Sequence, residues 1–322
     1  MTTHTPKLII HGGAGRAFAD PSRAEIVRAS LNAALLPVMD ELLAGASSLD
    51  AVVMGCRLLE DDPIFNAGTG SAIQSDGIVR MSAALMQASK QRSPTFSGVI
   101  NVEQVRHPID MAAFLQGERD RVLAGKGASL LARELNLELH DPIVERRLIE
   151  WLRERGLDFA ADAVDVVAGA PTPEPEHEHG TGTIGVVALD SSGAIAAGTS
   201  TGGRGFERVG RVSDSATPAG NYATEFAGVS STGIGEDILD ACLSARVVVR
   251  VSDGFSLHDA LEKSMRESEA REHMLGAIAI SHDGCIGWAK TSDILLAAYH
   301  DGTTYADTID LPHGTITQVH EG

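Results

Sequence analysis

Thr183 is the residue of this sequence whose position most clearly suggests chemistry. It follows Gly182 and begins an apolar run, residues 183–189, that is typical of an interior strand. A threonine hydroxyl is a weak nucleophile unless a base takes its proton. A cut between Gly182 and Thr183 would free an α-amine on the same residue, and such amines titrate at about pH 7.7–8.0. We therefore predict cleavage of this bond, which would create a nucleophile and its base together.

The segment before Thr183 is predicted to be a flexible linker over about residues 157–182. Residues 171–179 contain only proline, threonine, glutamate and histidine, so they have almost nothing to bury in a core. A metal site at His177 and His179 is a weaker interpretation, because histidines two apart in an acidic run are more typical of solvated charge.

The predicted cut divides one domain, residues 1–322, into two subunits. The α subunit would span residues 1–182 and the β subunit residues 183–322. Thr181 also follows a glycine and is therefore a rival cleavage site. Thr183 is preferred because it adjoins the predicted strand.

Two further groups could support a nucleophilic threonine. Residues 183–189 and 194–200 are separated by a Ser- and Gly-containing turn, which predicts a hairpin. Thr201 would then lie at the end of the second strand, within hydrogen-bond reach of the first. Thr232 and Gly233 precede a predicted helix, and a hydroxyl with a backbone N–H at such a strand end could stabilise an oxyanion.

Arg211 and Asp214 lie three residues apart in a glycine-flanked loop. An arginine fork can hold a carboxylate through two hydrogen bonds, and a nearby aspartate can hold an ammonium group. The pair could therefore bind the two ends of one zwitterion. The alternative is a surface ion pair, which would contribute little.

The predicted elements favour antiparallel sheets between helical layers over a βαβ series. Helical spacing places Ile26, Leu31, Leu35, Val38 and Leu42 on one face of a helix over about 23–43, and Ser48 is predicted to cap the next helix. Further helices are predicted over 49–59, 111–133, 142–154, 236–251 and 257–269, and closing strands over 275–281, 285–290 and 294–300.

Composition limits the classes of protein that this chain can represent. With 322 residues, 43% of them hydrophobic, the chain can bury a large core. Its net charge of −18 argues against nucleic acid or an anionic membrane as a partner and leaves a small-molecule substrate open. The three cysteines, Cys56, Cys242 and Cys285, lie in apolar segments and predict buried, reduced thiols. With no signal-peptide pattern, they favour a cytoplasmic location.

Six segments, in order, resemble the plant-type L-asparaginase / isoaspartyl peptidase family of N-terminal nucleophile hydrolases. They are IHGGAG at 10–15, LLEDDPIFNAG at 58–68, GTIGVVALD at 182–190, STGG at 200–203, GRVSDS at 210–215 and VSSTGIGE at 229–236. The resemblance implies a four-layer αββα sandwich, self-cleavage before Thr183 and a dimer of αβ units. It implies hydrolysis of the side-chain amide of L-asparagine, of β-aspartyl dipeptides, or of both.

The resemblance also implies roles for individual residues. Thr201 matches the threonine that supports the nucleophile, and Thr232 and Gly233 match the oxyanion hole. Arg211 and Asp214 match the residues that hold the substrate's α-carboxylate and α-amine. Asn66 matches an asparagine near the nucleophile. No organic cofactor is implied, but a structural sodium ion is, held by the backbone oxygens of Leu59, Glu60, Asp62, Phe65, Ala67 and Thr69.

Departures from the family pattern leave alternatives open. Residues 82–88 lack the two acids and the glycine that the family commonly carries there, and Ile234 replaces a second threonine. A relative that no longer matures is therefore one alternative, and a glycosylasparaginase of the same fold is another. A phosphate-binding loop at residues 12–15 is disfavoured, because the segment lacks both the GxGxxG spacing and a P-loop lysine.

Overall fold

The structure, a computed structural model, describes residues 4–18, 20, 22–156 and 182–317. Gly182 and Thr183 are therefore described. The rest of the predicted linker, with Thr181 and the histidines at 177 and 179, lies outside the described residues.

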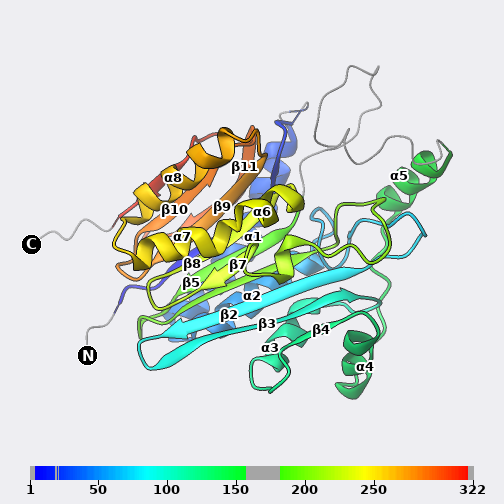
Figure 1. The fold of residues 1–322 in the computed structure, drawn as a ribbon, viewed down its shortest axis with the longest axis horizontal. Helices are drawn as coiled ribbons and strands as arrows, with labels where there is room; N and C mark the ends of the chain where they lie inside the picture. Colours follow the sequence, from blue (N-terminus) through cyan, green and yellow to red (C-terminus); the bar gives the residue numbers. More distant parts are fainter. Residues whose placement is uncertain (1–3, 19, 21, 157–181, 318–322) are drawn as a thin grey trace, which may run out of the picture.

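Two sheets face each other at the centre of the described chain (Figure 1). The larger has eight strands in the order β12-β11-β1-β5-β6-β2-β3-β4, and the smaller has five in the order β13-β10-β9-β8-β7. All described strand pairs are antiparallel except β3 with β4. The strands of the larger sheet are β1 (Lys7–Gly15), β2 (Met81–Ser89), β3 (Arg92–Val102), β4 (Val122–Ala124), β5 (Ile184–Leu189), β6 (Ile195–Thr201), β11 (Ile294–His300) and β12 (Tyr305–Asp307); those of the smaller sheet are β7 (Asn221–Ala223), β8 (Ala227–Gly233), β9 (Leu275–Ser281), β10 (Ile286–Lys290) and β13 (Gly314–Ile316).

Helices cover the outer face of each sheet. Figure 1 shows α7 and α8 in front of the smaller sheet, with α1 and α2 behind the larger one. Separate apolar clusters fill the space between the sheets and the two spaces between a sheet and its helices. The predicted αββα sandwich is thereby confirmed. The helices are α1 (Ser22–Leu43), α2 (Ser48–Asp61), α3 (Pro108–Leu115), α4 (Lys126–Glu134), α5 (Glu145–Gly156), α6 (Gly235–Ala241), α7 (Leu243–Ser252) and α8 (Leu257–Glu269), with a 3-10 turn, η1, at Asp214–Ala216.

Two local predictions were wrong by one residue. Ile26 of α1 is 56% exposed, and Val27 is buried in its place. The N-cap of α2 is Ser47, whose hydroxyl accepts the Asp50 N–H, while the Ser48 N–H donates to Asp190.

Two long predicted helices are each interrupted. The helix predicted over 236–251 breaks into α6 and α7 at Cys242, which has a left-handed φ of 48° and is exposed. Its thiol is therefore not buried as predicted, whereas those of Cys56 and Cys285 are. The helix predicted over 111–133 is likewise divided into α3 and α4, with the strand β4 between them.

The segment that departs from the family pattern, residues 82–88, forms most of β2. Ser82 pairs with Thr201 and Ala84 with Thr199, so β2 lies directly beside β6. All seven of its residues are buried. The absence of acids from these buried positions therefore suits an interior strand.

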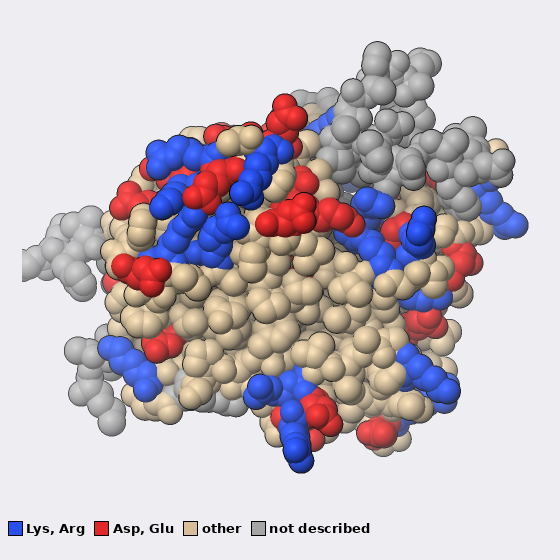
Figure 2. All heavy atoms as spheres, in the orientation of Figure 1, with Lys and Arg blue, Asp and Glu red and all other residues tan. Residues whose placement is uncertain are grey.

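Charge is unevenly distributed on the face shown in Figure 2. Charged side chains gather over α7 and α8 and around the rim, whereas the middle, in front of β7 and β2, is largely uncharged. No described helix combines the length and apolar character needed to cross a membrane.

Candidate active site

The β5–β6 hairpin brings Thr183 and Thr201 together. Ile184, the residue after Thr183, pairs with Ser200, the residue before Thr201, in the antiparallel ladder. The Thr183 Oγ1 donates a hydrogen bond of 3.0 Å to the Thr201 Oγ1, which also accepts the Gly203 N–H at 3.1 Å. Thr201 is thus oriented by the backbone beyond its strand to accept a hydrogen bond from the candidate nucleophile.

The peptide group before Thr183 is held from two sides. The Gly182 N–H donates to the Gly12 carbonyl of β1 at 3.0 Å, and the Gly182 carbonyl accepts the Asn66 N–H at 3.2 Å. The Asn66 side chain is fixed in turn, because its Oδ1 accepts the Ala72 N–H at 2.8 Å and its Nδ2 donates to the Gly203 carbonyl at 2.6 Å. The predicted asparagine therefore contacts the predicted cleavage bond through its backbone.

Thr232 reaches the same bond from the smaller sheet. It lies at the end of β8 and is 1% exposed, and its Oγ1 has no hydrogen-bond partner among the described residues. A Cβ atom built on Gly182 would lie 3.7 Å from this oxygen. Gly233 has φ +130°, and a Cβ there would lie 2.5 Å from the Met274 carbonyl oxygen, so only glycine fits without strain. A buried hydroxyl without a described partner thus lies close to Gly182, the residue before the predicted cleavage bond.

Arg211 and Asp214 lie side by side next to Gly235. A Cβ built on that glycine would be 2.5 Å from the Arg211 Nη2 and 2.9 Å from the Asp214 Oδ1. Asp214 is 3% exposed, and its Oδ2 has no hydrogen-bond partner within the described chain. Burial raises the pKa of Asp214 to about 7, against the lowering effects of the Ser213 hydroxyl and the Arg211 charge. The pair can therefore offer opposite charges to one zwitterion.

A buried chain of hydrogen bonds behind Thr183 was not found by sequence reasoning. The His11 Nε2 contacts the Ser230 Oγ at 2.9 Å, and this hydroxyl contacts the Thr199 Oγ1 at 2.7 Å. Burial lowers the pKa of His11 to about 3, against an opposing contribution from the Thr183 backbone, so the imidazole is neutral at cellular pH. A Cβ on Gly185 would lie 2.0 Å from the Ser230 Oγ, so a glycine at this position of β5 leaves room for the hydrogen-bonded side chains. The sequence signal for this chain of hydrogen bonds was the presence of His11 in the segment at 10–15 that resembles the family.

The sequence analysis named Glu60 only for its backbone oxygen and did not predict a role for its side chain. It is fully buried at the end of α2, and its carboxylate accepts the Ser200 hydroxyl at 2.6 Å and lies 3.3 Å from the His107 Nδ1. Burial raises the pKa of Glu60, against the lowering effects of the hydrogen bonds from His107 and Ser200. The carboxylate thereby ties α2 to the strand that carries Thr201.

The predicted sodium loop, residues 59–69, comprises the last three residues of α2 and a compact turn that follows it. The Glu60 carbonyl accepts the Thr69 N–H at 2.8 Å, and the Asp62 carbonyl accepts the Phe65 N–H at 3.2 Å. A carbonyl oxygen has a second lone pair, so these bonds leave both groups able to bind a hard cation. The described residues contain no cluster of three or more His, Cys, Asp or Glu side chains that could hold a metal ion. A cation here would therefore depend on the backbone.

Two antiparallel sheets between helices, with a threonine at the start of an interior strand, are typical of the N-terminal nucleophile hydrolases. The family model described as "Asparaginase" matches residues 4–309. The chain is 55% identical over 310 residues to an isoaspartyl peptidase/L-asparaginase of Synechocystis sp., covering 96% of this chain and 92% of that protein. It is 52% identical over 310 residues to a protein of the same name from Nostoc sp., covering 96% of each.

A more distant relative is the plant-type L-asparaginase of Thermococcus kodakarensis, which is 34% identical over 300 residues and matches 91% of this chain and 95% of that protein. This chain belongs to the asparaginase family, and it is a hydrolase.

Proposed function

We propose that this protein cleaves its own chain before Thr183 and then hydrolyses L-asparagine and β-aspartyl dipeptides to release L-aspartate. The observation that carries the proposal is the contact between the Thr183 and Thr201 hydroxyls, next to a Gly182 carbonyl held by the Asn66 N–H. The names of the two cyanobacterial relatives support both substrates. They favour this activity over that of a glycosylasparaginase.

In the self-cleavage step, the Thr183 Oγ attacks the Gly182 carbonyl carbon. The Asn66 N–H, which already donates to the Gly182 carbonyl, and the nearby Thr232 hydroxyl would stabilise the negative charge that develops on the carbonyl oxygen. The Gly182–Thr183 C–N bond breaks as its nitrogen takes a proton, which leaves an ester between Gly182 and the Thr183 oxygen. Water hydrolyses the ester, giving a carboxylate on Gly182 and a free α-amine on Thr183.

In the mature enzyme, that amine acts as the base for the same hydroxyl. The Thr183 Oγ attacks the side-chain carbonyl of an aspartyl group, and the protonated amine gives its proton to the leaving nitrogen. Ammonia leaves from asparagine, or an amino acid leaves from a dipeptide. Water then releases L-aspartate from the ester. Arg211 and Asp214 would hold the α-carboxylate and α-ammonium of the substrate throughout.

The pKa of Asp214 predicts a pH dependence of substrate binding. The substrate's ammonium group needs an ionised Asp214, so binding weakens as the pH falls through about 7. For one such group we expect the KM for L-asparagine to rise about tenfold between pH 8 and pH 6. Ionisation of the Thr183 amine changes kcat and kcat/KM by the same factor and therefore cancels in KM. The pH dependence of KM then reports Asp214. A flat KM over this range would contradict the assignment.

We also propose a sodium ion in the 59–69 loop and a dimer of αβ units. The backbone carbonyls of the loop support the sodium ion. The largely uncharged middle of the face in Figure 2 supports the dimer. Replacing sodium by tetramethylammonium should lower the Tm if the loop binds the ion. Light scattering should give the mass of two complete chains rather than one.

The function is tested by incubating purified protein with L-asparagine and with a β-aspartyl dipeptide while following the chain by denaturing electrophoresis. We expect two fragments to appear, and aspartate release to grow with them. A single uncut band, with no aspartate released from either substrate, would contradict the proposal. It would favour a family member that does not mature.

A further inference from the structure

Glu236 occupies one edge of the guanidinium group that is expected to bind substrate. Its Oε1 accepts from the Arg211 Nε at 2.8 Å, and its Oε2 accepts from the Arg211 Nη2 at 3.0 Å. Arg204 approaches the same carboxylate, with its Nη1 3.9 Å from the Oε2. The Arg211 side chain is 13% exposed and that of Glu236 is 48% exposed. A partly exposed carboxylate thus fixes the orientation of a largely buried cation.

The other edge of the Arg211 guanidinium has hydrogen-bond donors without an acceptor among the described residues. A guanidinium has five N–H donors, and the fork with Glu236 uses one on Nε and one on Nη2. The remaining donors, both on Nη1 and the second on Nη2, have no recorded acceptor in the described part of the chain. A substrate carboxylate can therefore bind the Nη1 and Nη2 donors while the Glu236 carboxylate stays bound to Nε and Nη2.

Arg211 also has a second carboxylate within easy reach. The Arg211 Nη2 and the Asp214 Oδ1 flank the same point beside Gly235, yet no ion pair joins the two residues in the described chain. The Asp214 Oδ2 is buried without a hydrogen-bond partner among those residues. Opposite charges this close and this well buried attract strongly. If Arg211 turned to Asp214, each group would satisfy the other and neither would be left for a zwitterion.

We propose that Glu236 is a positioning residue that keeps Arg211 apart from Asp214, so that the two can bind the carboxylate and the ammonium of a free α-amino acid head group. The inference rests on the proposed function. It assigns Glu236 a role in selecting substrates whose head group is unblocked at both ends. Glu236 does not touch the reacting atoms; it acts through Arg211.

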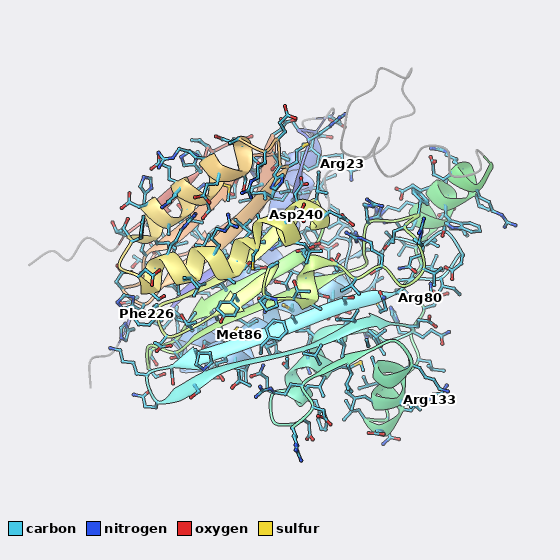
Figure 3. The ribbon with its side chains drawn as sticks, in the orientation of Figure 1. Arg23, Arg80, Met86, Arg133, Phe226 and Asp240 are labelled. Atoms are coloured by element: carbon cyan, nitrogen blue, oxygen red, sulfur yellow. The ribbon has the colours of Figure 1, made fainter. Side chains whose placement is uncertain are left out.

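The test uses Glu236→Gln, which keeps the shape of the side chain and removes its charge. Asp240→Asn is the matched control, because Asp240 lies on α6 as well, is exposed and forms no ion pair with any described residue (Figure 3). We expect E236Q to form both chains normally and to raise the KM for L-asparagine about tenfold, with kcat within about twofold of the starting value. D240N should change neither constant, and E236D should recover part of the loss.

A double-mutant cycle with Arg211→Ala separates positioning from a direct effect of charge. In the R211A background, E236Q should have no further effect on KM, because no guanidinium remains to be held. L-Asparaginamide, which lacks the α-carboxylate, should also bind E236Q less well, since Arg211 would have captured Asp214. An unchanged or lower KM in E236Q would overturn the proposal, as would an equal effect of E236Q with and without Arg211. Absence of cleavage and turnover in the unaltered protein would instead count against the proposed function.

Discussion

Replacing Thr183 by alanine is expected to give a folded, uncut and inactive chain. Alanine removes the only oxygen that can attack the Gly182 carbonyl from within the same residue, so neither self-cleavage nor acyl transfer can begin. Activity should fall by roughly 10⁴-fold or more. Denaturing electrophoresis after prolonged incubation, with a parallel assay of aspartate release, measures both effects.

Two companion variants make this result specific. Thr183→Ser keeps a hydroxyl and should still cleave, whereas Thr181→Ala removes the rival hydroxyl and should cleave normally. Two fragments from T183A would move the cut to another bond, with Thr181 the first to be examined. The circular dichroism spectrum and Tm of T183A should match those of the unaltered chain, which separates lost chemistry from lost folding.

Replacing Arg211 by alanine is expected to spare maturation and abolish efficient substrate binding. The Arg211 side chain forms no hydrogen bond or ion pair with Thr183, Thr201 or Asn66, so the cleavage bond should remain in place. The substrate's α-carboxylate would lose a two-point charged hydrogen bond. We expect kcat/KM for L-asparagine to fall about a hundredfold, with most of the loss in KM.

Arg208→Ala is the matched control for this change, because Arg208 lies in the same loop and is exposed. It should alter kcat/KM by less than about twofold. Unchanged turnover of β-aspartyl dipeptides by R211A would remove Arg211 from the substrate site. Failure of R211A to cleave would instead place Arg211 in maturation.

The hairpin that carries the chemistry could be predicted because its signals are local. An apolar run, a Ser- and Gly-containing turn and a second apolar run predict β5 and β6, and the pairing of Ile184 with Ser200 then places Thr183 beside Thr201. The place of Thr232 at a strand end suggested an oxyanion site, whereas a role for Asn66, in the loop after α2, was implied only by the family resemblance. These contacts depend on how two sheets stack, which local patterns do not specify.

Other features depend on tertiary contacts that periodicity does not contain. The helix predicted over 236–251 has suitable residues throughout, yet Cys242 takes a left-handed conformation that turns α7 onto β8. Glu236 belonged to a matched segment, but its pairing with Arg211 joins residues 25 positions apart across a loop. The buried contacts of His11 and Glu60 are likewise visible only once β1, β6 and β8 are assembled.

The central claim is that one backbone cut turns the Thr183 hydroxyl into an amino-terminal nucleophile. Mass spectrometry of the purified, active protein, combined with amino-terminal sequencing, tests it most directly. The account predicts one chain that ends at Gly182 and a second whose first residue is Thr183 with a free amine. Full activity in a sample that contains only the intact chain of 322 residues would contradict it.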